Sequence, residues 1–158
     1  MEEISFITTE ELGKLAKWLR VLGYDCEYCS DKKESALVIK ALRDKRVLLT
    51  RTERLKKFTG IKTVVIKHDH VEDQIEQVIK ELGLPLDKEK VLERCVECNV
   101  PLSCVKKNDI KEKVPEHVYN TQETFKECPG CGKVFWRGTH WSNVDKKVEE
   151  MRRKTGKR

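Results

Sequence analysis

Two Cys-x-x-Cys pairs, Cys95-Val-Glu-Cys98 and Cys128-Pro-Gly-Cys131, constrain this chain more than any other feature of its sequence. The two thiols of such a pair bind one metal ion through a tight loop, and two pairs fill the tetrahedral coordination that Zn²⁺ prefers. Twenty-nine residues separate the pairs, so we expect a hairpin or loop of its own between them. A four-cysteine site leaves no open position for a substrate. The sequence therefore predicts structural zinc, with a redox-active Cys-Pro-Gly-Cys as the alternative.

Three further cysteines, Cys26, Cys29 and Cys104, lie outside these pairs. The spacing of Cys26 and Cys29 would suit a metal, but they fall in a predicted strand, where residues three apart point to opposite faces. We expect ordinary, partly buried thiols there. Many cysteines in a chain with no signal-peptide pattern indicate a reducing compartment, so we expect a cytoplasmic protein. No apolar run is long enough to cross a bilayer, and we expect no membrane partner.

Strand and helix patterns alternate four times between residues 4 and 83. The predicted strands are residues 4–7, 24–29, 47–49 and 63–66, and apolar residues recur at helical spacing after each of them. Such alternation is typical of parallel strands joined by right-handed crossovers. The sequence therefore predicts an α/β fold with three layers, in which helices cover both faces of a mostly parallel sheet.

The alternation of strands and helices ends at Leu84-Pro85-Leu86-Asp87, and the segment with the two cysteine pairs follows. We predict an α/β domain over residues 1–88, a four-cysteine zinc ribbon over residues 92–142, and a basic C-terminal helix and tail over residues 143–158. The formal net charge is +6, of which residues 145–158 carry +4. A basic balance favours a polyanionic partner such as RNA, although a solvated helix end would explain the same charges.

Polar residues follow the predicted strands where a parallel sheet binds its ligands, beyond the carboxyl ends. Carboxylates gathered at that edge could hold Mg²⁺ or Mn²⁺ and activate water for attack on phosphate. The alternative is that these side chains cap the following helices, a role that suits Thr8, Asp31, Thr52 and Asp69. The acidic candidates at the edge are Glu10, Asp31 and Glu53.

Four blocks of the sequence resemble one protein family. They are residues 6–25 (FITTEELGKLAKWLRVLGYD), 46–51 (RVLLTR), 95–102 (CVECNVPL) and 128–141 (CPGCGKVFWRGTHW). The blocks are similar to the Mut-seven C-terminal RNase domain family, a PIN-like group, and the resemblance covers about residues 4–145. It implies a PIN-like α/β/α fold, a zinc ribbon, and a metal-dependent endoribonuclease that acts on RNA.

The resemblance also implies two aspartates that this chain lacks, because Thr9 and Thr52 stand in their places. A hydroxyl is a poor substitute for an anionic ligand of a hard cation. Glu10 and Glu53 each lie one residue further on, and Asp31 and Glu34 lie near another acidic region of the family. If the site is active, the candidate catalytic residues are therefore Glu10, Asp31, Glu34 and Glu53.

We predict an RNA-binding protein of ribonuclease ancestry whose nuclease site is weakened or lost. The first alternative is an active endoribonuclease dependent on Mg²⁺ or Mn²⁺, and the second is an adaptor on a ribonucleoprotein. Trp136 and Trp141 could stack on bases, or pack in a core. The predicted RNA-binding residues are Lys14, Lys17, Arg20, Arg51, Arg137 and His140, and the predicted zinc ligands are Cys95, Cys98, Cys128 and Cys131.

Overall fold

A four-stranded parallel sheet forms the centre of the first half of the chain in this computed structural model, which describes residues 3–31 and 33–156 apart from the side chains of residues 139–141. The strands are β1 (Ser5–Thr8), β2 (Asp25–Tyr28), β3 (Val47–Thr50) and β4 (Thr63–Val65), in the order β2-β1-β3-β4. In register, Phe6 of β1 aligns with Cys26 on one side and Val47 on the other. The predicted parallel sheet is confirmed, with strand ends within two residues of those expected.

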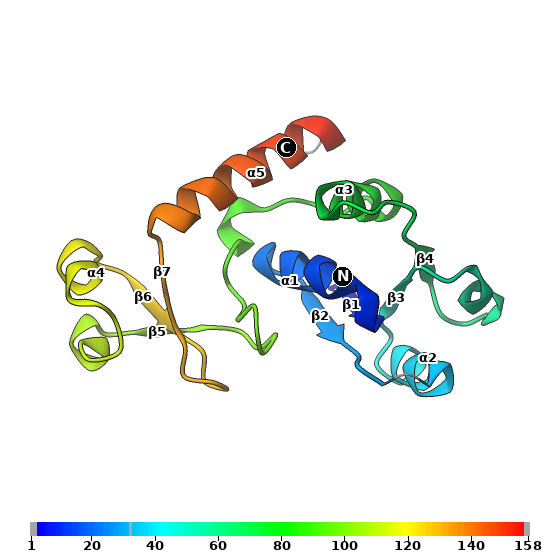
Figure 1. Ribbon diagram of the computed structural model, residues 1–158, viewed down its shortest axis with the longest axis horizontal. Helices are drawn as coiled ribbons and strands as arrows, with labels where there is room; N and C mark the ends of the chain where they lie inside the picture. The colour runs from blue at the N-terminus through cyan, green and yellow to red at the C-terminus, as the bar shows by residue number, and fades with distance from the viewer. Residues whose placement is uncertain (1–2, 32, 157–158) are drawn as a thin grey trace.

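Helices cover both faces of this sheet, as Figure 1 shows. One face carries α1 (Gly13–Val21), which follows a 3-10 turn at Glu10–Leu12, together with α3 (Val71–Leu82). The other face carries α2 (Glu34–Arg43) and a 3-10 helix, η2 (Glu53–Lys57). Because both faces are covered, the central strands β1 and β3 are buried along almost their whole length, whereas the edge strand β2 carries Asp25 and Glu27. Cys26 and Cys29 are buried in the two different cores, as their strand spacing predicts.

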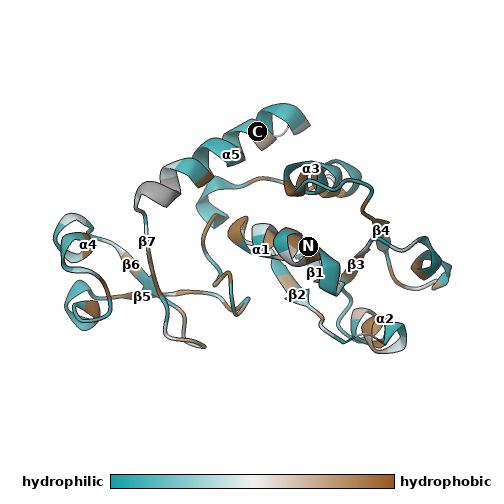
Figure 2. Ribbon diagram, viewed as in Figure 1, coloured by the Kyte–Doolittle hydropathy of each residue, from teal (hydrophilic) through white to brown (hydrophobic). Residues whose placement is uncertain are grey.

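The last helix, α5 (Thr139–Thr155), lies along α3 and completes the core on the α1 side. It is mostly hydrophilic along its length, as Figure 2 shows, but Val148 and Met151 are buried among the residues of α1 and α3. Lys147 lies 5.2 Å from the ring centroid of Trp18 and 3.6 Å from a carboxylate oxygen of Glu72. Several charges of the predicted basic helix are thus engaged within the protein. Residues 157 and 158 of the predicted tail lie outside the described residues.

A three-stranded antiparallel sheet forms the second half of the chain. Its strands are β5 (Ser103–Val105), β6 (Phe125–Glu127) and β7 (Val134–Trp136), in that order. The long segment between the cysteine pairs contains β5, a 3-10 helix (Lys107–Ile110) and α4 (Glu116–Thr121) before it reaches β6. A small core of Ile110, Val114, Val118 and Phe125 holds this insertion together, and Trp136 packs against it.

The connection between the two halves packs on the end of α1. It runs through Leu84 and Leu86, both buried, and a 3-10 turn at Lys88–Lys90. Gly23 adopts φ +94, and a Cβ there would lie 2.4 Å from the carbonyl oxygen of Lys90. Only glycine fits this close approach, and its left-handed backbone is also typical of the residue that follows the last turn of a helix. No helix among the described residues is both long and apolar enough to cross a membrane.

Candidate functional site

The four cysteines of the two pairs meet at one point. Their sulfur atoms all lie within 4.8 Å of one another, and the sulfurs of Cys95 and Cys131 are 3.8 Å apart. A tetrahedron with metal–sulfur bonds of ~2.3 Å has edges of about 3.8 Å, so the cluster has the dimensions of a four-thiolate zinc site. Within the part of the chain that the structure describes, this is the only metal-sized group of His, Cys, Asp or Glu.

The two Cys-x-x-Cys loops have the same backbone geometry. The residue after each pair is left-handed, Asn99 at φ 66 and Gly132 at φ 76, and its N–H donates to the carbonyl of the first cysteine at 2.9 and 2.8 Å. Backbone N–H groups also donate to sulfur: that of Cys98 to Cys95 at 3.4 Å, and those of Gly130 and Cys131 to Cys128 at 3.3 and 3.4 Å. Such bonds stabilise thiolates, the form in which cysteine binds a metal.

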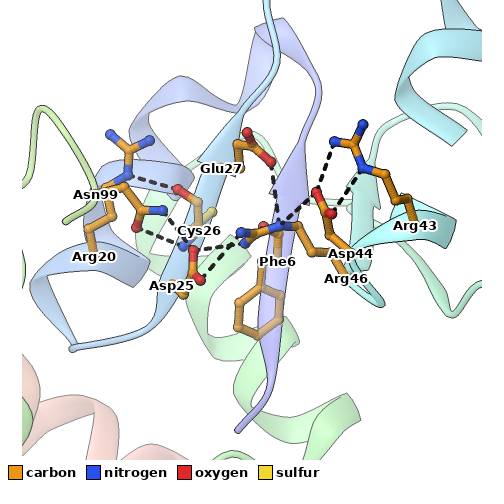
Figure 3. A network of polar contacts seen from close by, with 9 residues as sticks. All are labelled: Phe6, Arg20, Asp25, Cys26, Glu27, Arg43, Asp44, Arg46 and Asn99. Atoms are coloured by element: carbon orange, nitrogen blue, oxygen red, sulfur yellow. Dashed lines mark hydrogen bonds and ion pairs between the residues drawn. The ribbon is translucent and has the colours of Figure 1, made fainter. Parts of the chain in front are cut away.

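The first of these loops is attached to the α/β core through two side chains, shown in Figure 3. Arg20, only 8% exposed, donates from Nε to the carbonyl of Cys26 at 2.8 Å and from Nη1 to the carbonyl of Val96 at 2.7 Å. Asn99 accepts from the N–H of Cys26 at 2.9 Å and donates to Asp25 at 2.7 Å. The loop therefore covers the open edge of β2.

Asp25 is the polar centre of this contact. Its carboxylate also pairs with Arg46, whose Nη1 lies 2.7 Å from Oδ1 and donates in addition to the carbonyl of Phe6 at 3.1 Å (Figure 3). Burial raises the pKa of Asp25, but the hydrogen bonds from Arg46 and Asn99 outweigh burial and hold the pKa below its usual value. The carboxylate is therefore ionised and occupied by these two partners.

A second candidate site lies at the carboxyl ends of β1 and β3. These strands are neighbours, but the chain continues from β1 to β2 on one side and from β3 to β4 on the other. There a pocket of about 230 Å³ is lined by the rim threonines Thr9, Thr50 and Thr52 and by charged side chains. This crevice is where open parallel sheets bind ligands. Its charged lining residues are Glu10, Glu11, Asp31, Lys33, Glu34 and Arg54.

Three of the four acidic candidates line this rim pocket: Glu10, Asp31 and Glu34. The fourth, Glu53, is 67% exposed and lies 3.8 Å from the ammonium group of Lys56, outside the lining. Glu11 also lines the pocket, although it is not among the predicted catalytic residues. The sequence feature that could have identified Glu11 is its position directly after Glu10, close to the end of β1.

The acidic side chains of the rim pocket do not form a ligand set for a hard cation. Arg54 donates from Nε to Glu34 at 2.6 Å, and Asp31 accepts from the backbone N–H of Lys33 at 2.9 Å. No three carboxylates among the described residues come close enough together to share an ion. The residues present at the rim therefore do not fit a Mg²⁺ or Mn²⁺ site of the carboxylate type.

The predicted helix caps at the rim are mostly wrong. The residues that precede the first helical turns here are Thr9, Lys33, Thr52 and His70, and none of them makes a side-chain cap. The hydroxyl of Thr50 accepts from the N–H of Thr52 at 3.1 Å instead. Within the described structure, the buried hydroxyls of Thr8 and Thr9 have no hydrogen-bond partner. Capping thus does not explain the polar residues of the rim.

The predicted RNA-binding residues are spread over several surfaces. Lys14 and Lys17 are exposed on α1, whereas the guanidinium of Arg20 is enclosed by carbonyl groups. Arg51 donates to the carbonyl of His68 at 2.6 Å and pairs with Asp69 at 2.8 Å. Arg137 is exposed just after β7. The side chains of His140 and Trp141 lie outside the description.

Comparison with known proteins gives one family. The family model described as the Mut7-C RNAse domain matches residues 4–148. Searches of curated proteins and of solved structures find no match. The match confirms the resemblance seen in the sequence and suggests a ribonuclease-related function. Because it spans nearly the whole chain, the protein belongs to the Mut7-C RNAse domain family.

Proposed function

We propose that this protein binds RNA and has lost most or all of the nuclease activity that its family suggests. The observation that carries the proposal is the rim pocket, where threonines stand at the ends of β1 and β3 and the carboxylates are dispersed. Glu34 has its charge balanced by Arg54, and Glu53 lies outside the pocket lining. Such a pocket lacks the anionic cluster that a two-cation or one-cation hydrolysis of phosphate needs.

The four-cysteine cluster supports one structural zinc ion in this proposal. Cys95, Cys98, Cys128 and Cys131 would occupy all four positions of a tetrahedral ion, which leaves none for water or substrate. The ion would hold the two loops together and so keep the ribbon and the edge of β2 in place. None of the seven cysteines, all within the described residues, forms a disulfide, and a reducing compartment such as the cytoplasm would keep their thiols available for zinc.

RNA affinity would come from basic side chains that remain accessible. The exposed candidates are Lys14, Lys17, Arg51 and Arg137, with His140 as a further candidate beyond the described side chains. Arg20 is left out, because it is only 8% exposed and its donors bond protein carbonyls, whereas Arg51 is exposed although it pairs with Asp69. Binding through lysines and arginines releases counterions, so the affinity should fall steeply as salt rises.

The experiment that tests the proposal measures binding and cleavage separately. Native protein is titrated into fluorescently labelled RNA at low and high salt, and RNA integrity is followed on gels with Mn²⁺ and with a chelator. A Thr9→Asp/Thr52→Asp variant is run beside it, with Thr9→Asn/Thr52→Asn as a control of equal size and no charge. We expect salt-sensitive binding by all three proteins, and Mn²⁺-dependent cleavage by the aspartate variant alone.

Two other results would contradict the proposal in different ways. If native protein cleaves RNA with Mn²⁺ and Glu34→Gln abolishes cleavage, the chain is an active endoribonuclease that uses Glu10, Asp31 and Glu34 despite their spacing. If native protein has no affinity for RNA even at low salt, the adaptor on a ribonucleoprotein is the better description.

A further inference from the structure

A groove of about 500 Å³ separates α1 from the first Cys-x-x-Cys loop. One wall is the solvent side of α1, with Lys14 and Lys17, and the other is Glu97 of the cysteine loop. The ring of Tyr28, at the end of β2, closes one end of it. Arg20 lies at its base and fixes the distance between the walls, because it is bonded to the carbonyls of both β2 and the loop.

Tyr28 is an exposed aromatic ring that is held in position. The residue is 40% exposed, and its hydroxyl donates to the carbonyl of Glu10 at 2.8 Å. Gly13 lies beside it, where a Cβ would be only 3.6 Å from the ring carbon Cε2. A side chain at Gly13 would therefore contact the ring, and glycine leaves more of the ring exposed. Glu10 lines the rim pocket, so the hydrogen bond between Tyr28 and Glu10 joins a residue of the groove to a residue of that pocket.

The charges along the groove favour an anion. Lys14 and Lys17 are one turn apart on α1 and therefore lie on the same face. Lys17 lies 3.5 Å from Glu97, but both side chains are more than half exposed, and ion pairs of this kind are weak. A phosphate group can therefore displace Glu97 from Lys17. An aromatic ring beside neighbouring lysines is the combination by which proteins bind unpaired nucleotides.

We propose that this groove binds single-stranded RNA, with one unpaired base stacked on Tyr28 and the adjoining phosphates on Lys14 and Lys17. The inference rests on the proposed RNA-binding function and deepens it. A duplex is disfavoured, because its paired bases cannot reach a ring at the end of a groove. The strand would pass from the cysteine loop to the rim pocket, which links the two candidate sites of the molecule along one path.

The stacking contact is tested with two variants of the same residue. Affinity for labelled single-stranded and duplex RNA is measured by fluorescence anisotropy for native protein, Tyr28→Ala and Tyr28→Phe. Loss of one stacked base should weaken single-strand binding about tenfold or more in Tyr28→Ala. Tyr28→Phe keeps the ring and loses only the hydrogen bond to Glu10, so its affinity should stay close to native. Duplex binding should change little in either variant.

The phosphate contacts are tested by charge changes of opposite sign. Lys14→Glu/Lys17→Glu should abolish most single-strand binding, whereas Glu97→Gln should strengthen it a few fold by releasing Lys17. The control is Lys45→Glu/Lys62→Glu, which makes the same charge change at exposed lysines just before the amino ends of β3 and β4, whereas Tyr28 lies at the carboxyl end of β2. Circular dichroism of each variant checks that the fold is kept.

The outcomes separate this inference from the broader proposal. If native protein binds RNA but Tyr28→Ala and Lys14→Glu/Lys17→Glu bind it equally well, RNA binding stands and the groove is not its site. If native protein prefers duplex RNA, the stacking contact is wrong. If native protein binds no RNA, both proposals fail. Binding of an acidic protein segment that Lys14→Glu/Lys17→Glu abolishes would then identify a protein as the occupant of the groove.

Discussion

Asn99 accepts a hydrogen bond from the backbone N–H of Cys26 at 2.9 Å, although 73 positions separate the two residues along the chain. Cys26 lies in β2, an edge strand whose outer N–H groups have no neighbouring strand to bond. The side chain of Asn99 thus replaces part of a missing strand, and its left-handed backbone directs it there. The metal-sized cluster and the α/β core are coupled through this contact.

Removing the Asn99 side chain should destabilise the protein without changing its metal content. We expect Asn99→Gly to lower the free energy of unfolding by about 1–3 kcal/mol, because the N–H of Cys26 and the carboxylate of Asp25 each lose a partner. Glycine keeps the left-handed backbone, so the loss reports the side chain alone. Denaturant unfolding and zinc analysis measure the two quantities, and an unchanged midpoint would show that water replaces the amide at no cost.

Asn99→Asp should be worse than Asn99→Gly at neutral pH, although its shape is closer to that of asparagine. It places a second carboxylate where the amide nitrogen now lies 2.7 Å from Asp25, and two like charges at that distance repel. Protonation of one of them removes the repulsion. We therefore expect the gap in stability between the two variants to narrow as the pH falls below about 5, followed by chemical denaturation across that range.

Asp25 should make the native protein sensitive to acid. The pKa of its carboxyl is lowered in the folded state, so its contribution to stability is present above the unfolded value of about 3.9. That contribution is lost as the pH falls through the folded value. Asp25→Asn should reduce the free energy of unfolding at pH 7 and make it fall less steeply as the pH is lowered. The measurement is the free energy of unfolding between neutral pH and pH 3. If this free energy falls as steeply in Asp25→Asn as in the native protein, other carboxylates cause the acid sensitivity.

Chelation of zinc should unfold more than the ribbon. A metal present at one hundred to one thousand times its Kd stabilises the folded state by about 3–4 kcal/mol, and this is lost when the metal is removed. Because Asn99 and Arg20 join the first cysteine loop to β2, amide exchange should rise in residues 25–28 as well as in residues 95–99 and 128–132. Cys128→Ser should behave like the chelated protein. Increased exchange confined to the ribbon would show that the two halves fold independently.

Arg54 should limit metal binding even when the missing aspartates are restored. In a Thr9→Asp/Thr52→Asp background, we expect Arg54→Gln to raise Mn²⁺ affinity several fold, since it frees Glu34 and removes a positive charge from the rim pocket. Titration of Mn²⁺ followed by electron paramagnetic resonance measures this. Lys56→Gln, whose partner Glu53 lies outside the pocket lining, is the control and should have little effect.

The sequence predicts the parallel sheet well, because its signals are local. Leu15, Leu19 and the apolar residues of α3 repeat at helical spacing, and the runs around Leu48 and Val64 are too short and apolar for anything but buried strands. The four cysteines are predicted for a similar reason, since each loop specifies its own geometry. The expected hairpin between them is present, because β5 pairs antiparallel with β6. The two short helices in its connection are not predicted, because the small core around Ile110 and Val118 is built from scattered residues.

The contacts that join the two halves of the chain produce no pattern in the sequence around the residues that make them. Arg20 follows Lys14 and Lys17 at helical spacing, which makes it look like part of an exposed basic ridge. Its burial depends on carbonyl groups of Val96 and Glu97, more than seventy residues away. Asn99 and Arg54 are equally invisible, because their partners are distant in the chain. At the rim, sequence reasoning finds Glu10, Asp31 and Glu34 but cannot tell that an arginine neutralises one of them.

The position of α5 bears on how this protein is made. Val148 and Met151 fill a core whose other residues come from the first ninety or so positions. A ribosome must therefore deliver almost the whole chain before that core is complete, and until then the part of the core that Val148 and Met151 fill stays open to solvent. Nascent chains stalled before residue 148 should accordingly attract chaperones, whereas those that carry α5 beyond the exit tunnel should not.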